Sequence, residues 1–571
     1  MLGLTACGDN LGPPPPQCSW EQWGRSAGHD GATCAHGQPL ERALARITYD
    51  PFLAGEVADG RGDLLVHYQV PLIAGDDIYM LEKAGTYTPC MFDADDVETC
   101  DLYRLETQVW TEKRYRWDGD DLVAQWTFAS DWKPVPGIRF EPVFQPAIAG
   151  DQIAIPGAGG SVLLVDRVSG ALVDRVMPFG AVAADTYTVG GITVGGDGTI
   201  YYSTLAIDHD QPFFRDARSA LVVVSPDRRS VRTVDYATLI PGAPAATDTC
   251  EGQFDRDTPQ PLPPPPNPDG SRVLPPRTPC GSQRAAIDAA PALGVDGRIF
   301  VATRAHLNGR YSYVAALAPG DLSLLWATSL RGLLNDGCGV GVPADAVDGE
   351  ETDDCRVGAT LGVDPQTNLP PAAIVDDNSS SSPVALPDGG VLYGAFTRYN
   401  AFRGHLLRFD PTGAVAARYD FGWDTTPAVH ATATGFEVII KDNHYGEDAD
   451  GIDLGPFELA RLDESLRPQW HYTSTEQSSC ARDPNGMIVC SPDHPNGFEW
   501  CVNAPAIDAG GVTYANSEDG NLYAITADGN LRDRYFLDRA LGAAYTPVAL
   551  DERGRVYAMN GGTLTVVGAA R

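Results

Sequence analysis

The chain of 571 residues carries 76 acidic against 41 basic residues, a formal net charge of −35 at pH 7. An acidic surface of this kind repels phosphate backbones and anionic headgroups, which argues against nucleic-acid binding. Hydrophobic residues make up 43% of the chain and charged residues 20%, a globular composition. No apolar run reaches the roughly 18 residues that a transmembrane helix needs.

The first residues resemble the start of a bacterial lipoprotein. Leu4-Thr5-Ala6-Cys7 is similar to a lipobox, in which the cysteine carries the lipid, and the prolines at 13–16 are typical of a tether. Six residues precede Cys7, too few for a charged region and an apolar region of a signal peptide. Either the start codon lies upstream, which we favour, or the match is accidental. Cys7 is the predicted lipid attachment site.

The cysteines indicate an oxidising compartment. Apart from Cys7, the twelve cysteines fall in local groups, and none has the Cys-x-x-Cys spacing of a zinc ribbon or thioredoxin site. Pairs that bracket polar loops are typical of disulfides, although scattered reduced cysteines remain the alternative. We predict an extracytoplasmic protein with the pairs Cys18–Cys34, Cys90–Cys100, Cys250–Cys280 and Cys338–Cys355. If Cys7 is lipidated, one cysteine is expected to stay free among Cys480, Cys490 and Cys501.

A short motif recurs along the chain. In its clearest copy, Ala290 to Phe300, a proline and an apolar pair precede an Asp-Gly turn and a β-branched strand. Proline begins a strand where no ladder bond is needed, and Asp-Gly forms a tight hairpin turn. Alternating residues then give the strand one buried face. Eight copies begin at residues 70, 145, 191, 290, 383, 427, 505 and 547, of which the copy at 191 lacks the proline.

Most copies are followed by a second hairpin, and no helical stretch separates them. Four strands per repeat without helices is the pattern of a propeller blade. The sequence therefore predicts an all-β fold, an eight-bladed β-propeller of four-stranded antiparallel blades over residues 41–571. Residues 1–40 are expected to form a separate N-terminal segment with lipobox, tether and disulfide.

The last repeat has room for three strands, and an open sheet edge promotes aggregation. We therefore expect residues 43–52 to supply the missing strand, so that an N-terminal strand closes the ring against the C-terminal blade beside residues 556–567. Two inserted loops are predicted, a proline-rich one at 241–286 and a Gly-, Asp- and Ser-rich one at 335–382. Long excursions from compact folds are often functional, so we interpret both as partner-binding loops.

The blades resemble the quinoprotein-type propeller repeat. Residues 521–529 are similar to its consensus, and Trp126, Trp326 and Trp470 stand near its late tryptophan position. We expect these tryptophans to pack blade against blade. The resemblance implies enzymes that hold pyrroloquinoline quinone centrally with calcium and an acidic base, many with an adjacent cysteine pair. This sequence has no such pair and no Cys-x-x-Cys-His haem motif, and no calcium-ligand set can be matched. We therefore expect no quinone cofactor.

One acidic cluster could bind a metal ion. Asp448, Asp450 and Asp453 alternate around Gly451, and hard cations need several oxygen ligands on a flexible loop. The glutamate that ends an EF-hand loop is missing. A calcium site and a solvated acidic turn both remain open.

These features predict a non-enzymatic propeller lipoprotein that serves as a protein-binding scaffold. Its place would be the outer membrane, the cell surface or the periplasm, with a lipid anchor as its only membrane contact. In fold and anchoring it resembles the propeller lipoprotein of the outer-membrane barrel-assembly machinery. Two alternatives remain, a periplasmic dehydrogenase dependent on pyrroloquinoline quinone and an extracellular carbohydrate- or protein-binding adhesin. No catalytic or cofactor-binding residue is assigned.

Overall fold

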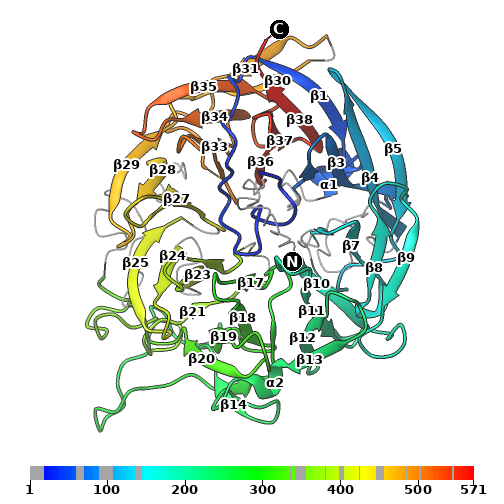
Figure 1. The fold of residues 1–571 in the computed structure, drawn as a ribbon. Coiled ribbons are helices and arrows are strands. Elements are labelled where there is room, and N and C mark those ends of the chain that lie inside the picture. The colour runs from blue at the N-terminus through cyan, green and yellow to red at the C-terminus, as the bar shows by residue number, and fades with distance from the viewer. Residues whose placement is uncertain are drawn as a thin grey trace, which may run out of the picture.

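In the computed structural model, eight sheets of four or five antiparallel strands are arranged radially around a central axis (Figure 1). This arrangement confirms the predicted all-β, eight-bladed propeller. The structure describes residues 18–59, 70–88, 107–136, 138, 145–334, 337–340, 355–377, 379, 381–397, 404–422, 425–444, 455–483, 485–500, 503–542 and 546–570.

The strands of each blade follow one another from the axis outward. Blades 1 to 3 contain β2 (Leu72–Ala74), β3 (Asp77–Gly85), β4 (Gln108–Asp118), β5 (Asp121–Ala129); β6 (Ala147–Ala149), β7 (Gln152–Pro156), β8 (Val162–Asp166), β9 (Leu172–Val176); and β10 (Thr186–Val194), β11 (Ile200–Ala206), β12 (Arg218–Val224), β13 (Val231–Asp235). In blades 4 and 5 two short inner strands share one partner: β16 (Gln283–Ala285), β17 (Ala292–Leu293), β18 (Ile299–Ala305), β19 (Ser312–Leu317), β20 (Leu324–Ser329); and β21 (Ala373–Ile374), β22 (Val384–Ala385), β23 (Val391–Thr397), β24 (Gly404–Phe409), β25 (Val415–Phe421).

Blades 6 to 8 complete the ring with β26 (Ala428–Ala431), β27 (Phe436–Asn443), β28 (Phe457–Leu462), β29 (Pro468–Thr473); β32 (Ala506–Ile507), β33 (Thr513–Asn516), β34 (Asn521–Ile525), β35 (Leu531–Phe536); and β36 (Val548–Leu550), β37 (Val556–Asn560), β38 (Thr563–Gly568), β1 (Arg42–Thr48). The N-terminal strand β1 pairs antiparallel with β38, from Arg42 opposite Gly568 to Thr48 opposite Thr563. The closure of the ring by the two ends of the chain is thus confirmed.

The remaining elements are short. They are α1 (Leu53–Asp59), the 3-10 turn η2 (Ala158–Gly160), α2 (Tyr236–Leu239), and two small hairpins, β14 (Thr249–Glu251) with β15 (Arg277–Pro279) and β30 (Ser479–Arg482) with β31 (Ile488–Ser491). Among the described residues, no helix is long and apolar enough to cross a membrane.

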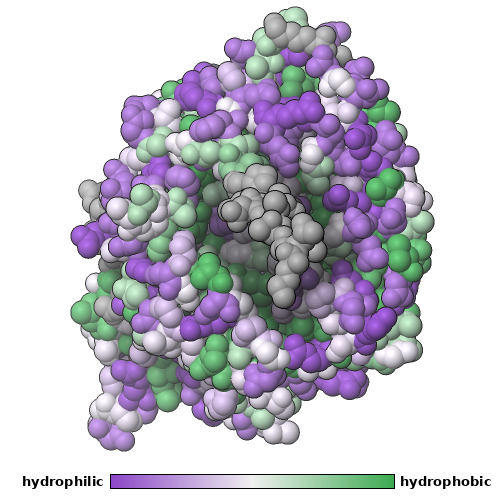
Figure 2. All heavy atoms as spheres, viewed as in Figure 1, coloured by the Kyte–Doolittle hydropathy of each residue, from purple (hydrophilic) through white to green (hydrophobic). Residues whose placement is uncertain are grey.

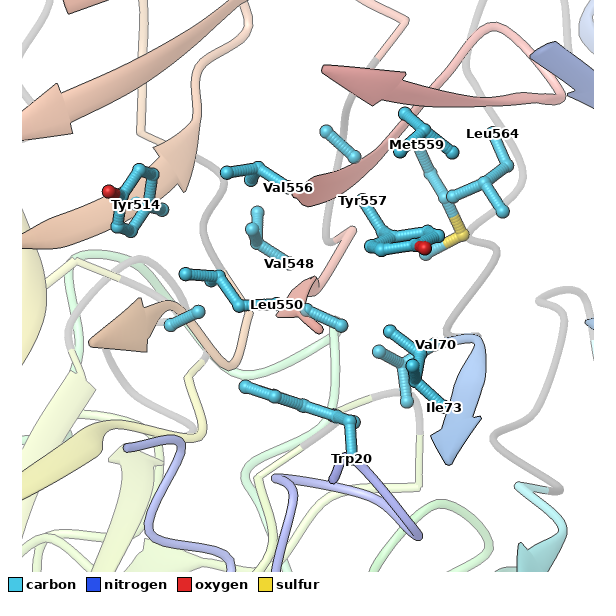
Figure 3. Packing of buried hydrophobic residues seen from close by; sticks show 14 of the residues in the cluster. Trp20, Val70, Ile73, Tyr514, Val548, Leu550, Val556, Tyr557, Met559 and Leu564 are labelled. Atoms are coloured by element: carbon cyan, nitrogen blue, oxygen red, sulfur yellow. The ribbon is translucent and has the colours of Figure 1, made fainter. Parts of the chain in front are cut away.

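Neighbouring blades pack face to face through their apolar residues. One cluster joins the sheets of blades 2 and 3, another those of blades 5 and 6. A third joins blades 7, 8 and 1 around Tyr557, and Trp20 from the N-terminal region lies within it (Figure 3). The alternation that marks the strands in the sequence therefore builds the contact surfaces between blades.

The late tryptophans lie at these contacts in a repeated way. Each tryptophan on the outer strand of one blade covers a turn glycine of the next: Trp126 covers Gly170, Trp326 covers Gly413 and Trp470 covers Gly529. A methyl group at these glycines would lie 2.5 to 2.8 Å from the ring, and each glycine has a positive φ. The tryptophans thus occupy packing positions between blades, as the sequence indicated.

Disulfides join Cys18 to Cys34, Cys250 to Cys280 and Cys338 to Cys355, the pairs that the local spacing predicts, and also Cys480 to Cys490. The predicted pair Cys90–Cys100 and the third cysteine of the last group, Cys501, lie outside the described residues. Because disulfides persist in oxidising compartments, the bonds indicate an extracytoplasmic protein.

Candidate functional site

Residues 18–38, which the sequence analysis assigned to a separate segment, lie at the centre of the propeller (Figure 1, dark blue). We call them the axial segment. The inner strand of a blade has no neighbouring strand on the axis side, so its free N–H groups need other partners. The axial segment supplies a hydrogen bond to each blade in turn: Trp20 to Ile73, Glu21 to Ile148, Gln22 to Val194, Ala27 to Leu293, Gly28 to Ala385, Asp30 to Val429, Gly31 to Ile507 and Gln38 to Gly554.

Side chains of the axial segment fill the space between the blades. Trp20 and Trp23 are fully buried. The Nδ1 atom of His29, also buried, donates to the carbonyl oxygen of Pro383 at 2.9 Å. Burial lowers the pKa of His29 to about 4, so this histidine is neutral at physiological pH. The axial segment is therefore part of the core.

Just before the inner strands, buried polar side chains tie one blade to the next. Ser382 Oγ accepts from the N–H of Ala290 at 3.0 Å, Thr426 Oγ1 from that of Ser382 at 3.1 Å, and Asn503 Oδ1 from that of Thr426 at 3.2 Å. Since these oxygens are committed to backbone groups of the neighbouring blade, they link blades 4 to 7 rather than facing a ligand.

A pocket of about 580 Å³ lies between the axial segment and blades 4 to 6, and we call it the axial pocket. The face of the ring seen in Figure 2 is hollowed near its centre and largely hydrophilic around the rim. Its wall is mainly aliphatic, with Leu293, Ala385 and Val429 among its residues. Its charged pair is Arg25 and Asp30, which are bonded to each other at 2.9 and 3.0 Å.

The axial pocket does not fit a calcium-bound quinone. Such a cofactor needs an aromatic platform, several oxygen ligands for the metal and a base. The residues that line the axial pocket include no tryptophan, tyrosine or phenylalanine, and its carboxylate, Asp30, is paired with Arg25.

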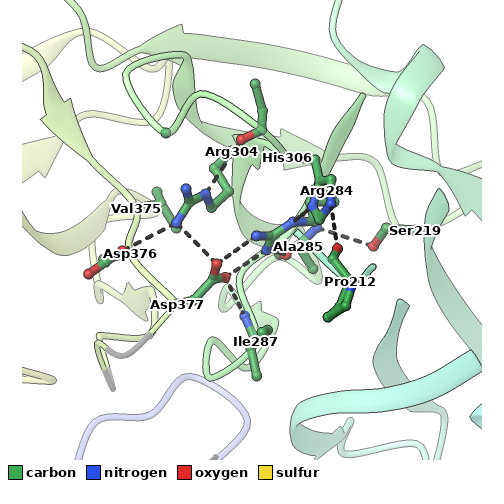
Figure 4. A network of polar contacts seen from close by, with 12 residues as sticks. Pro212, Ser219, Arg284, Ala285, Ile287, Arg304, His306, Val375, Asp376 and Asp377 are labelled. Carbon is green, nitrogen blue, oxygen red and sulfur yellow. Dashed lines mark hydrogen bonds and ion pairs between the residues drawn. The ribbon is translucent and has the colours of Figure 1, made fainter. Parts of the chain in front are cut away.

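A polar network beside the axis joins blades 3, 4 and 5 (Figure 4). Arg284 is fully buried and donates through two nitrogens to Asp377, each at 2.6 Å, and Asp377 also pairs with Arg304 at 3.1 Å. Although burial opposes its ionisation, the two arginines hold the pKa of Asp377 well below its usual value. Arg284 Nε donates to His306, which donates in turn to the carbonyl of Pro212. Arg304 also pairs with Asp376 at 3.2 Å, so two carboxylates compensate the two arginines and the network is a structural junction.

A second pocket, of about 540 Å³, lies where the insertion at 241–286 folds against blade 4. We call it the insertion pocket. The hairpin of β14 and β15 and the disulfide from Cys250 to Cys280 fix the insertion. Its wall is formed by Gly242, Ala243, Pro244, Asp248, Thr249, Cys250 and Arg277 from the insertion and by Tyr311, Tyr313, Ser329 and Arg331 from blade 4.

One carboxylate organises the cationic side of the insertion pocket. Glu251 accepts from Arg277 at 3.1 Å, from Arg331 at 3.2 Å and from the hydroxyl of Tyr311. Although partial burial opposes ionisation, a backbone N–H and the charges of Arg331 and Arg277 hold the pKa of Glu251 below its usual value. The guanidinium of Arg331 stacks on the ring of Tyr311 at 4.0 Å. Planar donor groups and aromatic rings are thus held in fixed positions.

The charges of the insertion pocket balance. The positive charges of Arg277 and Arg331 are balanced by two carboxylates: Asp248 lies in the wall of the pocket and Glu251 lies beside the pocket. An anionic ligand would meet the carboxylates and a cationic ligand the arginines. The arrangement therefore suits an uncharged ligand with many hydroxyl groups, which can donate to the carboxylates and accept from the arginines.

The sequence-predicted calcium and lipid sites are not among the residues that the structure describes. Asp448, Asp450 and Asp453, the candidate calcium ligands, and Cys7, the candidate lipid site, fall outside the described residues. The calcium and lipid sites stay predictions. The residues of the insertion pocket were missed, because Asp248 and Arg331 are far apart in the sequence and share no motif. The signal that pointed to the region was the proline-rich insertion bracketed by Cys250 and Cys280.

No protein-family model and no curated protein matches the chain. Solved structures share its fold. They include a europium-containing methanol dehydrogenase, 11% identical with a TM-score of 0.48 over 95% of this chain and 89% of that one. A quinohemoprotein alcohol dehydrogenase from Comamonas testosteroni is 9% identical, with a TM-score of 0.49 over 97% and 81%. BamB from Moraxella catarrhalis is 13% identical, with a TM-score of 0.36 over 92% and 99%.

The prediction of a non-enzymatic scaffold as the leading function is wrong on this comparison. Two of the three structures are alcohol dehydrogenases, which agrees better with the dehydrogenase alternative than with a scaffold. Fold does not determine function, because a ring of blades offers the same frame to different loops. At these identities the likeness is one of fold: the chain has the quinoprotein-type β-propeller fold that its repeats predicted.

Proposed function

We propose that this extracytoplasmic propeller binds neutral carbohydrate in the insertion pocket. The observation that carries the proposal is the balanced set of planar polar groups around Tyr311, Tyr313, Arg277 and Arg331 in a pocket of about 540 Å³. That volume suits a ligand of a few sugar rings. Hydrogen bonds to charged groups contribute about 1.5–3 kcal/mol each, so pre-positioned arginines and carboxylates favour hydroxyl-rich ligands.

The test is a titration of the full chain with a panel of neutral oligosaccharides, followed by calorimetry. Arg331→Gln removes the guanidinium that stacks on Tyr311 and is expected to weaken binding at least tenfold. The matched control is Arg408→Gln, since Arg408 also stacks on an aromatic ring, at 5.2 Å from Phe436, and pairs with Asp388 at 2.6 Å. Affinity equal in wild type and Arg331→Gln, or no binding of any panel member, would refute the proposal.

The same preparation tests the dehydrogenase alternative. Pyrroloquinoline quinone and calcium are added, and oxidation of alcohols and aldoses is followed with an artificial electron acceptor. We expect no stoichiometric quinone binding and no turnover, because the axial pocket lacks an aromatic platform and has its carboxylate Asp30 paired with Arg25. Turnover that depends on the quinone would replace carbohydrate binding by oxidation as the function.

We also propose that a lipid on Cys7 anchors the protein, which the resemblance to a lipobox supports. Expressed from a reading frame that extends upstream of Met1, the protein is expected to incorporate labelled palmitate, and Cys7→Ser is expected to abolish the label. Equal labelling of both proteins would refute the anchor.

A further inference from the structure

Three side chains of blade 6 converge on one face of its sheet. Asp442 on β27 and Glu458 on β28 are directly opposite each other in the antiparallel pairing. On β29, Thr473 is opposite Glu458, so His471, two residues before it, lies diagonally on the same face. His471 Nδ1 lies 2.7 Å from Glu458 Oε2 and 3.3 Å from Asp442 Oδ2. One ligand atom from each residue lies within 4.8 Å of the other two.

The two carboxylates lack a full counter-charge. Like charges directly opposite on neighbouring strands destabilise a sheet, and a buried charge needs a partner. The Asp442 side chain is 2% exposed and that of Glu458 16%. In the part of the chain that the structure describes, their ion-pair partners are histidines, with neither lysine nor arginine among them. A divalent cation would neutralise the pair.

Hydrogen bonds from outside the three residues orient the carboxylates. The hydroxyl of Tyr419, on β25 of blade 5, donates to Asp442 Oδ2 at 2.5 Å. Thr473 Oγ1 donates to Glu458 Oε1 at 2.6 Å, which leaves Oε2 turned toward His471. Outer partners of this kind usually hold the ligands of metal sites in place.

We propose that Asp442, Glu458 and His471 bind a divalent transition-metal ion, with Zn²⁺ as the best fit and water completing the coordination. Bonds of about 2.0–2.2 Å in a tetrahedral site place ligand atoms roughly 3.4 Å apart. His471 and Asp442 already have this spacing, at 3.3 Å, and Glu458 has to move less than about 1 Å from His471. Imidazole nitrogen with two carboxylate oxygens suits zinc better than calcium, which takes oxygen ligands. The His471 side chain is 33% exposed, so one side stays open to water.

This site goes beyond the proposed carbohydrate binding, since it is built on blade 6 from residues that the insertion pocket does not use. Its test is calorimetric titration of the chelator-treated full chain with Zn²⁺. Wild type is expected to bind Zn²⁺ at this site. His471→Asn and Glu458→Gln are each expected to weaken the affinity for Zn²⁺ at least tenfold. The control is His494→Asn: His494 pairs with the carboxylate of Asp493 at 2.7 Å, and no third metal ligand joins the two among the described residues.

X-ray absorption at the zinc edge gives a second readout, for which we expect nitrogen and oxygen neighbours including one imidazole. Circular dichroism of the metal-free variants verifies that they fold, and Glu458→Gln keeps the shape of the site if His471→Asn does not. Zn²⁺ affinity unchanged in both variants would overturn the proposal. An affinity for Ca²⁺ equal to that for Zn²⁺, and lowered to the same extent in the variants, would also overturn the proposal. The site would then not select a transition metal.

Discussion

Wild type is expected to lose stability as the pH rises above about 4.5, and replacing Glu112 with glutamine is expected to abolish a large part of that loss. Glu112 lies on β4 with 1% of its surface exposed. Among the described residues, neither of its carboxylate oxygens has a hydrogen-bond partner. Burial, with a smaller effect of the nearby Glu82, raises the pKa of Glu112 from 4.5 to about 8. The folded protein therefore holds this carboxyl protonated at neutral pH.

The sign follows from proton binding. Between pH 4.5 and 8 the unfolded chain releases the Glu112 proton and the folded protein keeps it, so stability falls as the pH rises through this window. The loss is complete once the folded group ionises, above about pH 8. At about 1.4 kcal/mol per pH unit, the loss is about 3 kcal/mol at pH 7 and at most about 5 kcal/mol above pH 8.

Guanidinium unfolding at pH 5 and pH 8 measures the effect. The free energy of unfolding of Glu112→Gln, minus that of wild type, should increase by about 3 kcal/mol between the two pH values, because glutamine does not titrate. The fixed cost or gain of the amide cancels in this difference. Glu464→Gln, at an exposed glutamate, is the matched control. A constant separation of the Glu112→Gln and wild-type curves would refute the assignment of a protonated buried carboxyl.

Two further substitutions test the packing. Gly413→Ala places a methyl group 2.5 Å from the ring of Trp326 at a φ of +86°, and should lower the free energy of unfolding by more than about 1 kcal/mol. The control is Gly75→Ala, because Gly75 also has a positive φ but has no atom near its added methyl group, so this variant measures the cost of backbone strain alone. An equal loss in both would show that Trp326 does not pack there. Trp23→Ala should cost about 3–5 kcal/mol, measured by denaturant unfolding, because the indole is fully buried. A cost below about 1 kcal/mol would mean that the axial segment is loosely held.

The blades could be predicted because their signals are local. Pro291 and the Asp296-Gly297 turn belong to one stretch of eleven residues, and the structure places an inner strand, a turn with Gly297 at φ +82° and β18 there in that order. The closing strand could be predicted because the last repeat was one strand short, and Arg42–Thr48 fills that place.

The axial segment could not be predicted in the same way. Its contacts with the blades are mostly single backbone hydrogen bonds, which any residue can form, and its path turns at Gly24 and Gly31 with no periodicity to reveal it. The insertion pocket escaped for a different reason. Asp248 and Arg331 come together only after the insertion folds onto blade 4, so neither carries a signal by itself.

The filled axis bears on where this propeller can hold a ligand. A quinoprotein-type ring can place its chemistry where all blades meet, but here the inner strands of blades 1 to 7 and the turn of blade 8 at Gly554 each form a hydrogen bond with the axial segment. Removing the axial segment from the centre of the ring would leave these backbone groups of the blades without their partners. It would also expose the buried indoles of Trp20 and Trp23. A substitution or insertion in the outer part of a blade has a more local effect, because each blade packs chiefly on its two neighbours. Polar pockets and candidate ligands therefore accumulate on single blades, as at the insertion of blade 4 and the Asp442, Glu458 and His471 cluster of blade 6.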